Sequence, residues 1–270
     1  MNIAIQGDAG SFHDEAARKL YGNDISLVAC ESFRDVFAAV ADGAAETGVV
    51  AVENSLYGSL HETYDMILKH KFPIIGEITL AIHQQLIGFP GATKAEITEV
   101  YSHPAALDQC RNYLEDHFPN ADIVEYYDTA AAVEHIKQSG LLGAAAIASK
   151  RAAEIHNMQI IQSNIEDETA NITRFVAITP LSKAIQGANK ATLVLTTSHT
   201  PGALYEALGV FQRYSANLTK LESRPIRGEV FKYQFIIDVL ASSSQLDQIQ
   251  NELAAQNCAA QLLGHYVASV

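Results

Sequence analysis

The stretch Asn171-Ile172-Thr173-Arg174-Phe175-Val176-Ala177-Ile178 is the part of the sequence on which the fold depends most. β-Branched and aromatic residues alternate in it, and the acidic run 166–168 precedes it, so the pattern predicts a strand. In a strand, Thr173 and Phe175 share one face and the charged Arg174 points to the other. A plain core strand lacks this mixture, so we expect the strand to serve a functional site.

Three earlier segments share one pattern, in which a strand ends in small polar residues and a helix follows. They are Gly7–Phe12, Asn54–Ser59 and Ser102–Pro104. Such junctions bring free backbone N–H groups to a helix N-terminus, which is a favourable place for an anion. The sequence therefore predicts an anion-binding site built from several strand ends.

Strands and helices alternate through the first two thirds of the chain, which indicates α/β architecture with parallel sheet. The apolar stretch 74–87 is too long for one buried strand, so we expect it to cross between two lobes, with 157–178 as the return. This predicts a two-lobed domain over 1–180 with a cleft: one lobe of about 1–77 and 158–180, the other of about 78–157.

A polar stretch at 180–190 predicts a linker. After it, the order strand, helix, strand, strand, helix, strand over 190–270 predicts an α+β domain with an antiparallel, ferredoxin-like sheet.

Composition narrows the choice of partners. A net charge of −13 and a pI near 5.1 argue against nucleic acid and anionic membranes, which require a basic surface. The three cysteines (Cys30, Cys110 and Cys258) indicate neither a disulfide framework nor a zinc module. With no signal sequence at the N-terminus, we expect a cytoplasmic protein. We also expect that it holds no metal.

Several common catalytic motifs are missing from the sequence. Gly7-x-x-Gly10 does not match a nucleotide-binding loop. A zincin motif would need histidine at position 65, where this chain has Asp65. The G-x-S-x-G motif of serine hydrolases does not occur. What remains is a set of hydroxyls and amides, which bind oxygen-rich anions but are poor bases. They are Ser11, Asn54, Ser55, Ser102, Gln109 and Thr173.

Five short spans of the sequence together resemble the motifs of the prephenate dehydratases. The matching spans, in order, are Gly7–Phe12, Val52–Ser55, Ser102–Cys110, Tyr127–Ala130 and Asn171–Phe175. The region with Gly202-Ala203-Leu204 and Asn217–Pro225 resembles the ACT regulatory domain of the same enzymes. No chorismate mutase segment is visible, so the resemblance is to the monofunctional form.

The resemblance implies a periplasmic-binding-protein-like catalytic domain that needs no cofactor and converts prephenate to phenylpyruvate with loss of carbon dioxide and water. It implies that Thr173 assists departure of the ring hydroxyl. It assigns substrate binding to Ser11, Asn54, Ser55, Ser102, Gln109, Arg174 and Phe175.

Some of these assignments stay open. Arg174 either binds a carboxylate or forms a structural salt bridge, for example to the 166–168 run. Asn54 and Ser102 are also ordinary helix-capping residues. The chain departs from the family pattern at His13, Tyr57 and Ala105, which bears on the choice between prephenate and its amino analogue arogenate.

The resemblance also implies that L-phenylalanine binds at an interface between two ACT domains of a homodimer or homotetramer and inhibits the enzyme. The implied contacts are Gly202, Ala203, Leu204, Asn217, Leu218, Glu222, Ser223, Arg224 and Pro225. Arogenate dehydratase and a non-catalytic two-lobed ligand sensor are the rival functions.

Overall fold

The computed structural model describes residues 1–181, 184–226, 228–229 and 232–269. The predicted linker at 180–190 and the predicted second domain at 190–270 each include positions outside these ranges. The chain folds into two compact units, one formed by Met1–Met66 with Ile78–Phe175 and the other by Ile67–Glu77 with Val176–Val270.

The first sheet has the strand order β2-β1-β3-β11-β5, and the short β4 pairs with β3. Strand β1 pairs in parallel with both β2 and β3. The strands are β1 (Asn2–Gln6), β2 (Ser26–Cys30), β3 (Thr47–Asn54), β4 (Gly58–Ser59), β5 (Ile74–Ala81) and β11 (Ile172–Ile178), and the associated helices are α1 (Phe12–Tyr21), α2 (Phe33–Ala41) and α3 (His61–His70).

The second sheet has the order β10-β6-β9-β7-β8. Strand β7 is parallel to β8 and β9, whereas β6 is antiparallel to β9 and β10. Its elements are β6 (Gln85–Gly88), η1 (Lys94–Glu96), β7 (Glu99–Ser102), α4 (Pro104–Gln109), α5 (Arg111–His117), β8 (Asp122–Glu125), α6 (Thr129–Gln138), β9 (Ala144–Ala148), α7 (Lys150–His156) and β10 (Gln159–Gln162).

Strand β9 shows why helices cover both faces of this sheet. All five of its residues are buried, and the period of two sends Ala145 and Ile147 into a core with α4 and α5. The alternate alanines pack with α6 and α7. Because alanine side chains are small, helices can pack closely against both faces of this strand.

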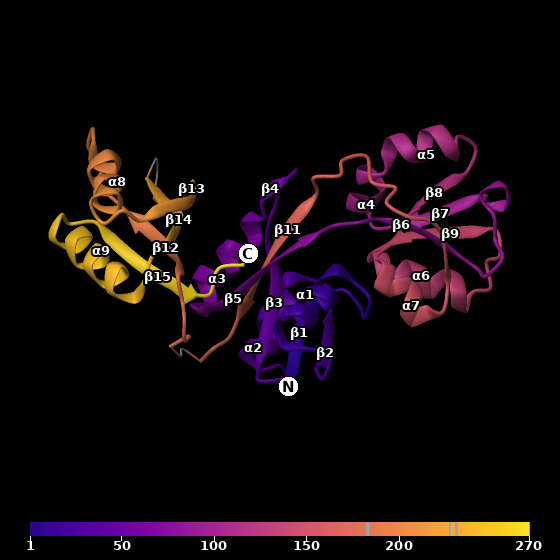
Figure 1. The fold of residues 1–270 in the computed structure, drawn as a ribbon, viewed down its shortest axis with the longest axis horizontal. Coiled ribbons are helices and arrows are strands. Elements are labelled where there is room, and N and C mark those ends of the chain that lie inside the picture. The colour runs from indigo at the N-terminus through magenta and orange to yellow at the C-terminus, as the bar shows by residue number, and fades with distance from the viewer. Residues whose placement is uncertain (182–183, 227, 230–231, 270) are drawn as a thin grey trace. The chain divides into compact units, whose positions relative to one another are not determined.

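The chain passes between the first two sheets twice, after β5 and before β11 (Figure 1). The predicted crossing at 74–87 is therefore confirmed, although it contains two strands. The helical segment after Pro104 is not continuous: Cys110, with φ −116° and ψ 19°, divides it into α4 and α5.

The third sheet is antiparallel throughout, in the order β13-β14-β12-β15. Its inward-facing residues, such as Leu193 and Ile237, pack with Phe211 of α8 and Ile249 of α9 in one core, so both helices contribute to the same cluster. This confirms the predicted βαββαβ fold. The elements are β12 (Lys190–Thr196), α8 (Ala203–Arg213), β13 (Asn217–Pro225), β14 (Tyr233–Leu240), α9 (Ser243–Ala255) and β15 (Ala259–Tyr266).

Candidate active site

A cavity of about 170 Å³ lies in the first unit, where the ends of β1, β3 and β11 meet the first turns of α1, α4 and α6. Four residues predicted from the sequence contribute to it: Ser11, Gln109, Thr173 and Phe175. The other described lining residues are Gln6, Phe12, His13, Ala51, Ile82, Gln84, His103, Ala105, Ala106, Asp128 and Thr129.

The hydroxyl of Thr173 is oriented by Asn54. The Asn54 Oδ1 atom accepts hydrogen bonds from the backbone N–H groups of Leu56 at 2.9 Å and Tyr57 at 3.2 Å, which fixes the direction of the amide. Its Nδ2 then donates to Thr173 Oγ1 at 2.8 Å and to Asn171 Oδ1 at 2.7 Å. Since Thr173 Oγ1 is the acceptor in that bond, its own O–H is available as a donor.

Phe175 and His13 form the apolar wall of the cavity. Phe175 is 1% exposed, and the His13 ring meets it edge-on with ring centroids 5.0 Å apart. The His13 Nε2 atom accepts from the Ala51 N–H at 3.3 Å, which places the proton of the neutral ring on Nδ1. Burial lowers the His13 pKa to about 4, so this imidazole is neutral at pH 7.

Two helices of ten residues begin at the cavity, α1 from one lobe and α6 from the other. Ser11 caps α1 by accepting from the Asp14 N–H at 3.3 Å, and Asp128 caps α6 by accepting from the N–H groups of Ala130 and Ala131. Helix N-termini carry partial positive charge and attract anions. Lysine and arginine are missing from the described lining residues, so these helix ends and neutral donors are what an anion would meet there.

The other four predicted residues are not among the described lining residues: Asn54, Ser55, Ser102 and Arg174. Ser102 is fully buried, and its hydroxyl donates to the Ile147 carbonyl at 2.6 Å inside the second sheet. Ser55 joins the turn after β3 to β11, because its hydroxyl donates to the Ala170 carbonyl at 2.6 Å and accepts from the Ile172 N–H at 2.9 Å. It caps no helix, since β4 intervenes and α3 begins only at His61.

Arg174 lies on the opposite face of β11 from Thr173, and its Nη1 is 3.6 Å from Glu53 Oε2 on the neighbouring β3. The partner suggested from the sequence, the 166–168 run, has other contacts: Glu166 accepts from the Gln84 N–H, and Asp167 accepts from the N–H groups of Asn112 and Tyr113. That suggestion is corrected by the cross-strand geometry, which brings Glu53 next to Arg174.

Several lining residues were missed in the sequence reasoning. Asp128 belongs to a span already noted, and its capping role explains Gly7, where φ is +85° and a Cβ atom would collide with Asp128 Oδ2. Gln84 had a weaker signal, namely a polar residue inside the apolar stretch 74–87.

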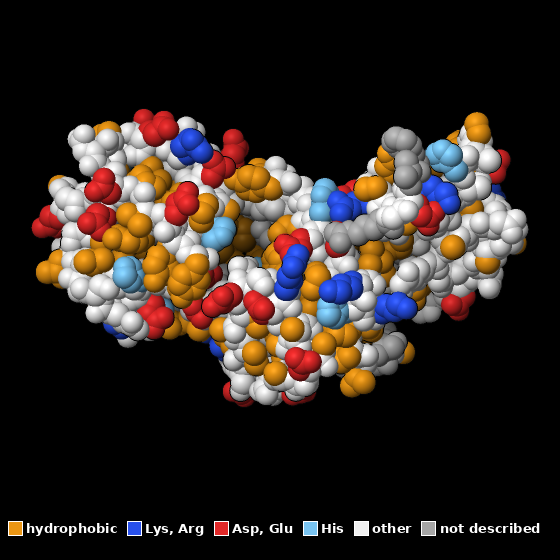
Figure 2. Space-filling view, turned by 180° about the vertical axis from the view of Figure 1, so that it is seen from behind, with side chains coloured by type: hydrophobic (Ala, Val, Ile, Leu, Met, Phe, Trp, Pro, Cys, Tyr) orange, Lys and Arg blue, Asp and Glu red, His pale blue; other side chains and the backbone are white. Residues whose placement is uncertain are grey.

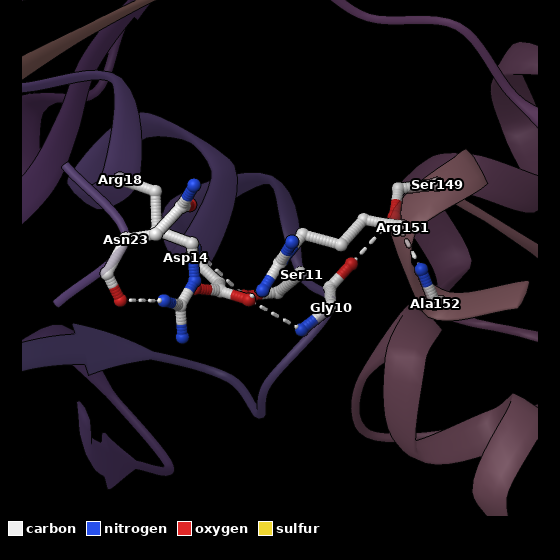
Figure 3. A network of polar contacts seen from close by, with 8 residues as sticks. All are labelled: Gly10, Ser11, Asp14, Arg18, Asn23, Ser149, Arg151 and Ala152. Carbon is white, nitrogen blue, oxygen red and sulfur yellow. Dashed lines mark hydrogen bonds and ion pairs between the residues drawn. The ribbon is translucent and has the colours of Figure 1, made fainter. Parts of the chain in front are cut away.

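The first turns of α1 and α7 are joined by a buried polar network (Figure 3). The Asp14 carboxylate is bound by Arg18 Nε at 2.6 Å and Arg151 Nε at 2.7 Å, and it accepts from the Gly10 N–H at 2.9 Å. The Ser149 hydroxyl, which caps α7, also donates to the Gly10 carbonyl at 2.5 Å. The network therefore ties the two lobes together beside the cavity.

The second unit contains a larger cavity of about 1060 Å³ near the start of α8. Among the residues predicted to bind a regulator, Gly202, Ala203, Leu204 and Ser223 line it. Asn217 and Leu218 lie at the far end of β13, opposite Leu240 and Val239, whereas the cavity adjoins the Tyr233 end of β14. One copy of the domain therefore brings only part of the predicted set together. Glu222, Arg224 and Pro225 belong to β13 but are not among the described lining residues.

The chain carries a net charge of −13. On the face shown in Figure 2, acidic, basic and hydrophobic side chains are interspersed. Within the described ranges, the structure contains no grouping of three metal-ligating side chains and no helix long and apolar enough to cross a bilayer.

The family model "Prephenate dehydratase" matches residues 3–183. Arogenate dehydratase/prephenate dehydratase 1 of Arabidopsis thaliana is 36% identical over 258 residues, covering 90% of this chain and 65% of the relative, so the chain spans a little under two thirds of that plant protein. A prephenate dehydratase from Arthrobacter aurescens, solved in complex with L-Phe, has a TM-score of 0.86 and 28% identity, and the match covers 100% of this chain and 90% of that one.

A structure of GqqA, described as a novel type of quorum-quenching acylase, has a TM-score of 0.84 and 31% identity, and the match covers 100% of this chain and 98% of that one. The fold, the order of the motifs and the family match over 3–183 agree. The chain belongs to the prephenate dehydratase family.

Proposed function

We propose that the protein is a prephenate dehydratase that forms phenylpyruvate and is inhibited by L-phenylalanine. The observation that carries the catalytic part is the oriented hydroxyl of Thr173, which accepts from Asn54 Nδ2 at 2.8 Å and keeps its proton for the cavity. The reaction needs a donor at this position and no strong base.

In this reaction the bond between the ring and its carboxylate breaks and releases carbon dioxide. The electron pair moves through the ring, and the carbon–oxygen bond to the ring hydroxyl breaks at the opposite end. Thr173 donates a hydrogen bond to the departing oxygen, which takes the Thr173 proton and leaves as water, and solvent returns a proton to Thr173. Such a bond strengthens as negative charge develops, so it lowers the barrier.

The remaining lining residues suit an anionic ring. Phe175 supplies an apolar wall, and the N-termini of α1 and α6 supply positive potential for carboxylates. His13 is neutral at pH 7 and adds a polar edge without charge.

The test compares Thr173→Val, which keeps the shape and removes the hydroxyl, with Thr173→Ser, which keeps the hydroxyl. We expect kcat for phenylpyruvate formation to fall about 100-fold or more in the valine variant and to stay within about tenfold in the serine variant. Wild-type turnover by the valine variant would overturn the mechanism.

Two other activities are measured in the same preparation. Arogenate is offered as a second substrate because the Arabidopsis relative carries both names. An acyl-amide substrate is offered because GqqA is described as an acylase. Amide hydrolysis needs an activated nucleophile, yet Thr173 is bonded to an amide and Ser11 to a backbone N–H, neither of which is a base. Turnover of the acyl amide alone would replace our proposal, and turnover of none would favour the ligand sensor.

The regulatory part of the proposal rests on the second cavity. The structure in complex with L-Phe has the same overall fold along the whole of this chain. Gly202 adopts φ +86° at the N-terminus of α8, a conformation that favours glycine and leaves the backbone accessible to a ligand. Because Asn217 is remote from this cavity within one domain, a second copy would have to supply it, in a homodimer or homotetramer.

Calorimetry with L-phenylalanine and light scattering test this part. We expect saturable binding, a dimer or tetramer in solution, and binding weakened about tenfold or more by Gly202→Val, since the side chain strains a left-handed residue at the cavity. A monomer that does not bind phenylalanine would overturn the regulatory proposal and leave the catalytic one intact.

A further inference from the structure

Gln84 is a buried residue of the cavity to which no role has yet been given. It lies between β5 and β6, is 2% exposed and lines the cavity. Its backbone is held on both sides, since the Gln84 N–H donates to Glu166 Oε2 at 2.8 Å and its carbonyl accepts from the Ile165 N–H at 3.0 Å. The side chain therefore starts from a fixed position.

The two ends of the Gln84 amide have different surroundings. Nε2 donates to Gln109 Oε1 at 2.9 Å, whereas Oε1 has no hydrogen-bond partner among the described residues. A buried acceptor without a partner is costly, so proteins seldom keep one without a reason. An acceptor of this kind in a cavity is a natural site for a ligand's donor.

Gln109 Oε1 accepts from Gln84 Nε2, so the Gln84 amide directs its oxygen away from Gln109 and that oxygen stays unpaired among the described residues.

We propose that Gln84 Oε1 accepts a hydrogen bond from a donor group of the substrate and makes Gln84 a specificity-determining residue. The inference rests on the function proposed above. Ionised carboxylates and a keto oxygen cannot donate, so the candidate donors are the ring hydroxyl, which prephenate and arogenate share, and the ammonium group, which only arogenate has.

The experiment measures kcat and KM of wild type and Gln84→Met with both substrates. Methionine has a similar length and no strong acceptor. We expect kcat/KM to fall about tenfold or more. An equal fall for both substrates assigns the bond to the ring hydroxyl, and a fall for arogenate alone assigns it to the ammonium; either result supports the proposal.

A matched control is Gln85→Met. Gln85 is also buried, but its Nε2 donates to the His83 carbonyl at 3.0 Å and it does not line the cavity. We expect this variant to keep the wild-type ratio of kcat/KM values for the two substrates, even if its melting temperature falls.

Two results decide the matter. If folded Gln84→Met retains kcat/KM within twofold of wild type for both substrates, the role of Gln84 is refuted while the proposed function stands. If wild type converts neither substrate, the proposed function fails and this inference fails with it.

Discussion

Arg151 Nε lies 2.7 Å from the Asp14 carboxylate, so a residue of α7 in one lobe holds the first turn of α1 in the other. Asp14 is fully buried, and it also binds Arg18 on its own helix. A buried carboxylate needs such partners because its desolvation is costly. The start of α1, which lines the candidate active site, is therefore positioned by both lobes.

We expect Asp14→Asn to lower the free energy of unfolding by about 3 kcal/mol, because two arginines lose their anion in a buried setting. Chemical denaturation measures this. The control is Glu15→Gln on the same helix, whose pair with Lys19 at 3.4 Å is more exposed and worth less than about 1 kcal/mol. Equal decreases in the free energy of unfolding would show that the ion pair between the lobes contributes no more stability than the exposed pair.

Gly10 and Gly22 both have positive φ angles, +95° and +83°, but only Gly10 faces a close neighbour. A Cβ atom at Gly10 would lie 2.9 Å from Ala152 Cα, whereas the space at Gly22 is open among the described residues. We expect Gly22→Ala to cost only the backbone strain, about 1–2 kcal/mol, and Gly10→Ala to cost clearly more. The melting temperatures of the two variants measure this difference. Similar decreases in both would show that the close approach at Gly10 adds no cost.

Asn54→Asp reverses a hydrogen bond at the proposed catalytic group. A carboxylate cannot donate to Thr173, so it would accept a hydrogen bond from the Thr173 hydroxyl and direct that O–H away from the cavity. We expect kcat to fall about tenfold or more while the far-ultraviolet circular dichroism stays native. Asn171→Asp, at the other acceptor of Asn54 Nδ2, keeps the bond to that nitrogen and serves as the control.

His13 makes stability depend on pH in a defined window. Its pKa is about 4 in the folded chain and near 6.5 when unfolded, so the unfolded state binds more protons between these values. The free energy of unfolding therefore falls as pH drops from 6.5 to about 4, by at most about 3 kcal/mol. His13→Gln removes this contribution, and denaturation at pH 7 and pH 4 should show a smaller difference. An identical pH dependence in both proteins would contradict the assignment.

Glu77 and Lys190 form a buried ion pair in the second unit, with Nζ 2.9 Å from Oε1 and 3.0 Å from Oε2. We expect Lys190→Met to cost about 3–5 kcal/mol, because the carboxylate loses its cation. The double variant Glu77→Leu with Lys190→Met should recover most of this loss. A double-mutant cycle by denaturation checks it, and additive losses would argue against coupling.

Local sequence patterns determined much of the fold. Alternation in Asn171–Phe175 correctly places Thr173 and Phe175 at the cavity and Arg174 on the opposite face. Strand-to-helix junctions predicted the first turn of α1, and the βαββαβ order predicted the third sheet. These features depend on neighbours in sequence, whose period of two or 3.6 is visible in the residues themselves.

Only the tertiary structure decided which polar groups meet. Glu53 faces Arg174 because β3 lies beside β11 in the sheet, and Ser102 is directed into its own sheet by the carbonyl of Ile147. The pairing of Asp14 with Arg151, and the hydrogen bond from Gln84 to Gln109, join segments far apart in the sequence. A hydrogen bond depends on ångström distances and direction, and long-range packing sets both.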